Sequence, residues 1–227
     1  MLDKVSVWQD SFGNDIELFL HASKPEAKNI LLVARFHGDE PEGEFCLREL
    51  MKEFSVSNNQ SPYNIYILPC LNPSGKKLFT RANGHEIDLN RNYPTSNFSA
   101  ISVNPHTKEM SSGEPASEVE TQIMMQIVGE YAFERILSIH SDLHLIDYDG
   151  PAKELASKFS LLCGYKLVDN IGYQTNGSFG TWAGIERKIP LITVETWHAQ
   201  NEADMLKIWQ ELKTAVYDFC QISQKTL

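Results

Sequence analysis

Two imidazoles and a carboxylate occur where strand-like segments of this chain end. His37 and Glu40 form an H-x-x-E pair just after the apolar run at 30–34, and His140 ends a second apolar segment. Ligands gather beyond the carboxyl ends of strands in α/β sheets, so these side chains can meet although they are far apart in sequence. Two histidines and one glutamate are the ligand set of a catalytic zinc site, with a fourth position left for water. Glu195, at the end of a third apolar segment, would lie beside them.

The H-x-x-E pair is weak evidence alone, and His140 has a competitor. His140 and His144 form an H-x-x-x-H pair, which would place both on one face of a helix. The sequence at 139–146 instead indicates a strand and a turn, so we expect His140 alone to face the site. We expect structural roles for the other histidines, which are His21, His85, His106 and His198.

A second cluster combines arginine and asparagine. Arg81 and Asn83 precede the stretch 88–94, which reads D-L-N-R-N-Y-P. Arginine suits bidentate binding of a carboxylate and also stabilises an oxyanion. The alternative interpretation is a salt-bridged surface loop.

A third cluster runs from Tyr173 to Trp182 and contains Gly177 and Gly180. These glycines allow the backbone to approach a pocket closely. Tyr173 could donate a hydrogen bond to a substrate, or it could be an amphipathic residue of the pocket wall.

Strand-like and helix-like segments alternate along the chain. Strands are predicted at 16–21, 29–35, 64–68, 135–140 and 190–196, and helices at 42–54, 117–131, 152–163 and 203–222. Ser117 and Glu120 form a capping-box pattern at the start of the second helix. The alternation predicts an α/β fold of three layers, with a mixed, mostly parallel twisted sheet and helices on both faces. The polar segment 94–115 breaks the pattern and is either a functional lid or a surface excursion.

Net charge and cysteine content argue against some classes of binding partner and cellular compartment. The formal net charge is −10, which argues against nucleic acid or an anionic membrane surface. No apolar signal-like run follows Met1, and the four cysteines show no C-x-x-C pairing, so we expect a cytoplasmic protein with buried thiols. The length of 227 residues suggests a single domain over 1–227.

Taken together, the ordered motifs resemble the zinc carboxypeptidases of the carboxypeptidase A type. The resemblance covers about residues 28–200 and rests on H-x-x-E at 37–40, the arginine cluster, S-I-H-S at 138–141, the segment 173–195 and T-V-E at 193–195. Local stretches at 112–118, 146–152 and 177–187 look most like the bacterial murein peptide amidases of that family.

The resemblance implies a role for each catalytic residue. His37, Glu40 and His140 would hold one zinc ion per chain. Glu195 would serve as general base and acid, and Arg81 would polarise the scissile carbonyl and stabilise the oxyanion.

Other roles implied by the resemblance concern the substrate. Asn90 and Arg91 would bind the carboxylate next to the scissile bond, and Tyr173 would close over the substrate. Asp88 would orient His37 from behind. Gly180 occupies the position that helps select the substrate, and we expect an open pocket floor there, suited to a long polar group.

The resemblance predicts a metallopeptidase that cleaves the γ-D-glutamyl–meso-diaminopimelate bond of murein peptides during cell-wall recycling. One departure is Asp142, where the amidases lead us to expect a proline beside the ligand His140. The alternatives are a general carboxypeptidase, an acyl-amino-acid deacylase of the succinylglutamate desuccinylase or aspartoacylase type, or a peptide-binding relative without activity. The predicted partner is a small peptide substrate with a free carboxylate.

Overall fold

A mixed sheet of eight strands forms the centre of the fold in the computed structural model, which describes residues 2–56, 60–102 and 110–223. The strands are β1 (Leu2–Gln9), β2 (Asp15–His21), β3 (Asn29–Ala34), β4 (Asn64–Leu68), β7 (Arg135–Ser141), β8 (Leu145–Asp149), β9 (Lys166–Leu167) and β10 (Leu191–Thr196). Their order is β1-β2-β4-β3-β7-β10-β8-β9. The pairs from β4 to β10 are parallel, whereas β1, β2 and β8 pair antiparallel with their neighbours, apart from the parallel pair of β8 with β9.

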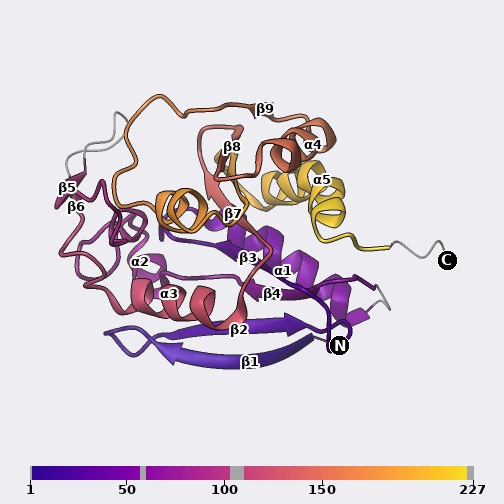
Figure 1. Cartoon of the computed structure of the whole chain (residues 1–227), viewed down its shortest axis with the longest axis horizontal. Helices are drawn as coiled ribbons and strands as arrows, with labels where there is room; N and C mark the ends of the chain where they lie inside the picture. Colours follow the sequence, from indigo (N-terminus) through magenta and orange to yellow (C-terminus); the bar gives the residue numbers. More distant parts are fainter. Residues whose placement is uncertain (1, 57–59, 103–109, 224–227) are drawn as a thin grey trace.

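Helices cover both faces of this sheet. They are α1 (Pro41–Val56), α2 (Pro73–Leu78), α3 (Val119–Tyr131), α4 (Lys153–Cys163) and α5 (Glu202–Phe219), with a 3₁₀ turn, η1 (Leu89–Arg91), and a π-helical turn, η2 (Gly180–Glu186). Figure 1 shows β1 and β2 at one edge of the sheet and α4 and α5 toward the other. The predicted three-layer α/β class is therefore confirmed.

Successive side chains of β3 point to opposite faces of the sheet and pack into two separate hydrophobic clusters. Ile30 and Leu32 pack with α1, α4 and α5 on one face, while Leu31 and Val33 pack with α3 and η2 on the other. A strand buried on both faces has no polar side to show, which explains its continuous apolar sequence. Helices on both faces hold the carboxyl ends of β3, β7 and β10 rigidly in place.

The capping box predicted at Ser117 is wrong. Helix α3 begins at Val119, and Ser117 instead accepts a hydrogen bond from Asn92 and donates one to Glu118. The segment 94–115 contributes two short paired strands, β5 (Ile101–Ser102) and β6 (Met110–Ser111). Residues 103–109, between these strands, lie outside the described part of the chain, as does His106.

Glu44 lies at the centre of a buried charge network at the start of α1. It is 4% exposed and binds Arg35 at 2.8 Å, Arg48 at 2.8 Å and Lys76 at 2.6 Å. Glu44 is thus a buried structural residue, although it lies in the first turn of α1. Arg35 is itself 6% exposed and directly follows β3 with a positive φ of 58°, so this network stabilises the turn that leads into the H-x-x-E segment.

Replacing Glu44 by Gln should lower the free energy of unfolding by about 3 kcal/mol, because it leaves the buried Arg35 without its carboxylate. Burial opposes ionisation of Glu44, but hydrogen bonds from Lys76 and Arg48 outweigh burial and lower its pKa. A lowered folded-state pKa stabilises the protein above the unfolded value of 4.5, and this contribution is lost as the pH falls further. Urea unfolding at pH 7, and in steps below pH 4.5 down to about pH 3, measures both effects.

Glu49→Gln is the matched control on the same helix. Glu49 pairs with Lys52, whose side chain is 70% exposed, so its loss should cost less than about 1 kcal/mol. Equal costs for the two variants would contradict a structural role for the Glu44 network.

Candidate metal centre and catalytic pocket

Three neighbouring strand ends bring the predicted ligands together. In the parallel pair of β7 and β10, His140 lies opposite Glu195, so both side chains leave the same face of the sheet. His37 follows β3, the other neighbour of β7, and Glu40 immediately precedes α1. The topology therefore unites residues that are a hundred positions apart.

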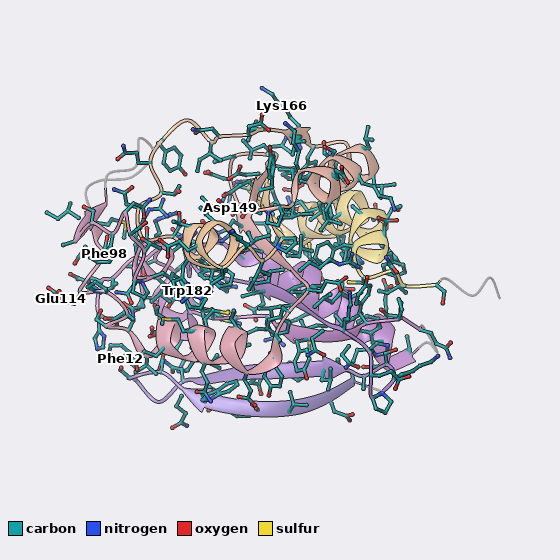
Figure 2. All side chains as sticks on the ribbon, viewed as in Figure 1. Phe12, Phe98, Glu114, Asp149, Lys166 and Trp182 are labelled. Carbon is teal, nitrogen blue, oxygen red and sulfur yellow. The ribbon has the colours of Figure 1, made fainter. Side chains whose placement is uncertain are left out.

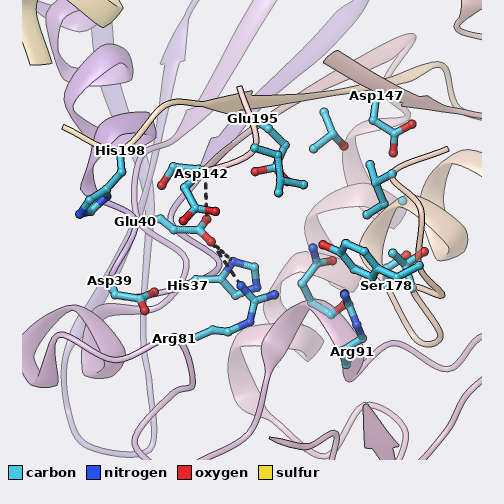
Figure 3. Close-up of a pocket in the computed structure, with 18 of the residues that line it drawn as sticks. His37, Asp39, Glu40, Arg81, Arg91, Asp142, Asp147, Ser178, Glu195 and His198 are labelled. Carbon is cyan, nitrogen blue, oxygen red and sulfur yellow. Dashed lines mark hydrogen bonds and ion pairs between the residues drawn. The ribbon is translucent and has the colours of Figure 1, made fainter. Parts of the chain in front are cut away.

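The ligand atoms of His37, Glu40 and His140 converge on one point. His37 Nδ1 lies 2.6 Å from Glu40 Oε1, His140 Nδ1 lies 3.0 Å from Glu40 Oε2, and the two Nδ1 atoms are 3.3 Å apart. All three residues are buried, and their candidate ligand atoms lie within 4.8 Å of one another. Figure 3 shows Glu40 and His37 at the base of the pocket.

This donor set fits zinc. Tetrahedral coordination with zinc–nitrogen bonds of about 2.0–2.1 Å places two nitrogen ligands roughly 3.3–3.4 Å apart, and the two Nδ1 atoms are 3.3 Å apart. Two nitrogens and one carboxylate beside an open cavity are also the composition of a catalytic rather than a structural zinc site.

The pKa values of two glutamates separate their roles. Burial opposes ionisation of Glu40, but the charges of His37 and His140 outweigh it and hold the Glu40 pKa below its usual range, as a ligand requires. Burial, followed by the charge of Glu40, raises the pKa of Glu195 to about 8. A cation at the ligand atoms would favour the ionised form of Glu195, because positive charge stabilises a neighbouring carboxylate.

Asp88 connects the candidate ligand His37 to Arg81. Its Oδ1 lies 3.3 Å from His37 Nε2, and its Oδ2 accepts a hydrogen bond from Arg81 Nε at 3.1 Å. Asp88 also accepts from the backbone N–H of Asn90 and so caps η1. Arg81 Nη1 lies 3.4 Å from Glu40 Oε1, which directs the guanidinium toward the ligand cluster. The salt-bridged loop interpretation is incomplete, because Asp88 is 2% exposed and contacts the candidate ligand His37.

Replacing Asp88 by Asn should weaken zinc binding by about 10- to 100-fold, because the His37 ring loses its anionic partner. Competition with a chromogenic chelator measures the affinity. Asp39→Asn removes the same charge from a neighbour of Glu40 and should change the affinity less. If both variants bind zinc as tightly as the original chain does, Asp88 does not position His37.

The turn that carries Asn90 and Arg91 is fastened to the loop that carries Tyr173. Asn90 Oδ1 accepts a hydrogen bond from the backbone N–H of Phe179 at 2.9 Å. A Cβ atom at Gly177, where φ is 71°, would lie 2.1 Å from the Arg91 carbonyl oxygen, so the two segments need glycine there. Packing fixes the turn and the loop relative to each other.

A cavity of about 360 Å³ opens onto this arrangement. Its lining includes seven of the nine predicted site residues: His37, Glu40, Arg81, Asn90, Arg91, Tyr173 and Glu195. The other two lie behind the wall, where both are buried: His140 in the ligand cluster and Asp88 against His37. Asp142 lines the cavity with its side chain in contact with solvent.

Sequence patterns missed a buried support beneath the site. Glu42, fully buried, accepts hydrogen bonds from Ser141 Oγ and the backbone N–H of Ala199, each at 2.9 Å, and pairs with His198 at 3.0 Å. Glu42 lies in the first turn of α1, yet its carboxylate is enclosed by other elements. No local signal reveals it, because Ser141 and Ala199 are 99 and 157 residues away.

The other histidines in the described part of the chain lie away from the ligand atoms. His144 is exposed and meets the ring of Tyr165 edge-on, His21 stacks on Phe54, and His85 pairs with Glu118. His198 lines the cavity but binds Glu42.

Comparison with known proteins identifies the family. The profile of the zinc carboxypeptidase family matches residues 9–215. The chain belongs to the zinc carboxypeptidase family. It is therefore a metallopeptidase, and the family's dependence on zinc agrees with the His–Glu–His cluster.

Relatives within the zinc carboxypeptidase family include murein peptide amidases. Murein peptide amidase A of Escherichia coli K12 is 30% identical over 174 residues, 73% of this chain and 69% of the relative. The enzyme of that name from Vibrio campbellii is 32% identical over 181 residues, 73% of this chain and 68% of the relative.

Solved structures share the fold. Murein-tripeptide amidase from Escherichia coli O157 superposes with a TM-score of 0.78 at 24% identity, covering 99% of this chain and 93% of that one. Carboxypeptidase A from Helicoverpa armigera gives 0.73 at 16% identity, covering 96% and 69%.

Proposed function

We propose that this metallopeptidase hydrolyses the γ-D-glutamyl–meso-diaminopimelate amide bond of murein peptides. The observation that carries the proposal is the likeness to murein peptide amidases, at 30% and 32% identity over more than two thirds of each chain. We further propose that it acts as a single catalytic domain in cytoplasmic recycling of cell-wall peptides. Four free cysteines fit a reducing compartment and support this proposal. Separately, no helix in the described part of the chain is long and apolar enough to cross a membrane.

The proposed mechanism assigns the metal to His37, Glu40 and His140. A zinc ion held there would lower the pKa of its bound water to about 7 and polarise the substrate carbonyl. Glu195 accepts the proton of the attacking water as the water oxygen bonds to the carbonyl carbon. Glu195 then delivers that proton to the amide nitrogen, so the carbon–nitrogen bond breaks and the amine leaves neutral.

Arg81 would stabilise the negative charge that develops on the carbonyl oxygen in the transition state. Its guanidinium is held by Asp88 and points toward Glu40, and in this proposal it would offer a fixed positive charge to the carbonyl that is attacked. A charge that meets the oxyanion only as it develops lowers the barrier without tightening substrate binding.

Residues on the opposite wall of the cavity would bind and position the substrate. Asn90 and Arg91 would bind the free carboxylate of the leaving amino acid, and Tyr173 would close over it. All three line the same cavity as Glu195. The hydrogen bond from the Phe179 N–H to Asn90 supports this assignment. It holds η1 and the 173–180 loop at a fixed distance, and substrate-binding groups on both segments therefore keep one geometry.

A substrate panel tests the proposal. Zinc-loaded protein is given L-Ala-γ-D-Glu-meso-diaminopimelate, an α-linked peptide with an ordinary C-terminal residue, acetyl-aspartate and succinyl-glutamate. We expect kcat/KM for the murein tripeptide to exceed the others by at least about 10-fold. Preferential turnover of the α-linked peptide would indicate a general carboxypeptidase. Turnover of only the acylated amino acids would indicate a deacylase.

A further inference from the structure

Helix α2 ends at an aromatic residue in the left-handed backbone conformation. The Thr80 N–H donates to the Gly75 carbonyl at 3.1 Å, and the Phe79 N–H donates to the Lys76 carbonyl at 3.3 Å, which together form the Schellman motif of helix ends. Phe79 occupies the left-handed position of this motif, with φ 54° and ψ 50°. Glycine is the usual residue there, because a Cβ atom is strained at positive φ. A bulky side chain in this conformation is an exception that calls for a reason.

Packing within the fold does not supply that reason. Phe79 is 63% exposed and belongs to neither hydrophobic cluster of the core. Within the described part of the chain, its ring stacks on no aromatic residue and carries no cation over its face. The side chain therefore buries little apolar surface, while the backbone beneath it is strained.

The catalytic cavity is where the Phe79 ring is presented. Phe79 lines the cavity together with His37, Arg81 and Glu195. Its neighbour Leu78, which is 61% exposed, does not line it. Strained residues cluster at sites where function keeps them. The position of Phe79 in the cavity lining therefore points to a role in binding a ligand.

The end of α2 forms one wall with the turn that carries the metal ligands. A Cβ atom at Gly38 would lie 2.0 Å from the carbonyl carbon of Gly75, so the turn and the helix are in direct contact. The Gly38 N–H also donates to the Arg81 carbonyl at 3.4 Å. Phe79 thus belongs to the wall that contains the H-x-x-E turn.

This wall lies across the metal centre from η1. Figure 3 shows Asp39, from the H-x-x-E turn, on the far side of His37 from Arg91. A substrate with its terminal carboxylate at Arg91 and its scissile carbonyl at the metal centre would extend its acyl part, on the carbonyl side of that bond, toward Asp39 and Phe79.

We propose that Phe79 is a specificity-determining residue that binds the apolar atoms of the acyl part of the substrate. In a γ-linked glutamyl peptide these atoms are the methylenes next to the scissile carbonyl. The inference rests on the proposed function in one respect, which is the direction of the peptide across the cavity. A ring that gains its apolar partner only when substrate binds explains why the chain keeps phenylalanine at a position suited to glycine.

The contact should act on substrate binding rather than on the chemical step. Water leaves the ring and the methylenes when the substrate binds, and neither group changes as the carbonyl is attacked. Such a contact stabilises the bound substrate and the transition state equally, so its loss raises KM and leaves kcat unchanged.

Replacing Phe79 by Gly should raise KM about 10-fold and keep kcat within about 2-fold. The midpoint of urea unfolding should not fall, because glycine relieves the strain and no packed contact is lost. Phe79→Leu, which restores apolar surface, should bring KM back to within about 3-fold of the original value. Steady-state kinetics and urea unfolding of the same zinc-loaded preparations measure these quantities.

Two control variants separate the ring from its surroundings. Ala132→Gly makes the same change at the end of α3, where Ala132 is exposed, has φ 46° and lies outside the cavity. Leu78→Ala removes the exposed apolar side chain next to Phe79. Both variants should keep the original KM and kcat.

Product inhibition assigns the ring to one side of the scissile bond. The two products of whichever compound in the substrate panel is cleaved are tested separately as inhibitors. Phe79→Gly should raise the inhibition constant of the acyl product about 10-fold and leave that of the amine product unchanged. If the panel shows that the murein assignment is wrong, the same two constants still test this inference.

Three results would overturn the inference. One is a KM that Phe79→Gly leaves unchanged. Another is weaker inhibition by the amine product alone, which would place the ring beside the leaving residue. The third is a fall in kcat or in the unfolding midpoint with no change in KM, which would make Phe79 a support for Arg81 or for the fold.

Discussion

Replacing Glu195 by Gln should lower kcat by about 10²–10⁴-fold while the zinc content stays unchanged. Gln keeps the shape of the side chain but accepts no proton from water, so the proposed proton transfer to the leaving amine is lost. Glu195 is not among the three residues whose ligand atoms converge, so its loss leaves the metal centre intact. Steady-state kinetics with metal analysis of the same preparation measures both quantities.

Glu202→Gln is the matched control, because Glu202 is exposed at the start of α5 and should leave kcat unchanged. Two results would contradict the role given to Glu195. One is normal turnover by Glu195→Gln. The other is the loss of zinc together with activity, which would make Glu195 part of the metal site.

His140→Ala should abolish both zinc binding and turnover. It removes one of two nitrogen ligands, so zinc affinity should fall by more than the roughly 10- to 100-fold that the loss of an outer partner causes. Small peptide substrates should then be hydrolysed at the background rate. Zinc titration with kinetics at each zinc concentration separates weakened binding from a damaged catalytic step.

His144→Ala is the natural control for this prediction. It changes the second histidine of the H-x-x-x-H pair, which is exposed and packs on Tyr165. We expect its zinc content and activity to match those of the original chain. If zinc were lost from His144→Ala and kept by His140→Ala, the assignment of the third ligand would be wrong.

The positions of the metal-centre residues could be predicted because they depend on sequence order and on strand ends. His37, His140 and Glu195 each follow or end an apolar run, and parallel strands bring such ends to one edge of a sheet. Two residues of an H-x-x-E pair are also close in space whatever the fold. Resemblance to a family then supplied roles that residue types alone left open.

The pocket floor expected to be open at Gly180 is occupied by Asp149, because a Cβ atom at Gly180 would lie 2.0 Å from Asp149 Oδ2 (Figure 2). This position of Asp149 could not be predicted, because it depends on register between distant strands. Asp149 reaches the space above Gly180 only through the pairing of β8 with β10, and β8 itself is too short and polar to show as a strand in the sequence. Glu42 was missed for a similar reason, since its partners lie on other elements. The capping box failed because Ser117 and Glu118 are engaged by tertiary hydrogen bonds.

Zinc titration of metal-free protein, with bound metal and release of diaminopimelate from L-Ala-γ-D-Glu-meso-diaminopimelate followed together, tests the central claim most directly. Activity should rise in proportion to bound zinc and reach its plateau at one zinc ion per chain, the capacity expected of the single His37–Glu40–His140 cluster. Turnover that persists without zinc, or zinc binding at this stoichiometry with no release of diaminopimelate, would contradict the account.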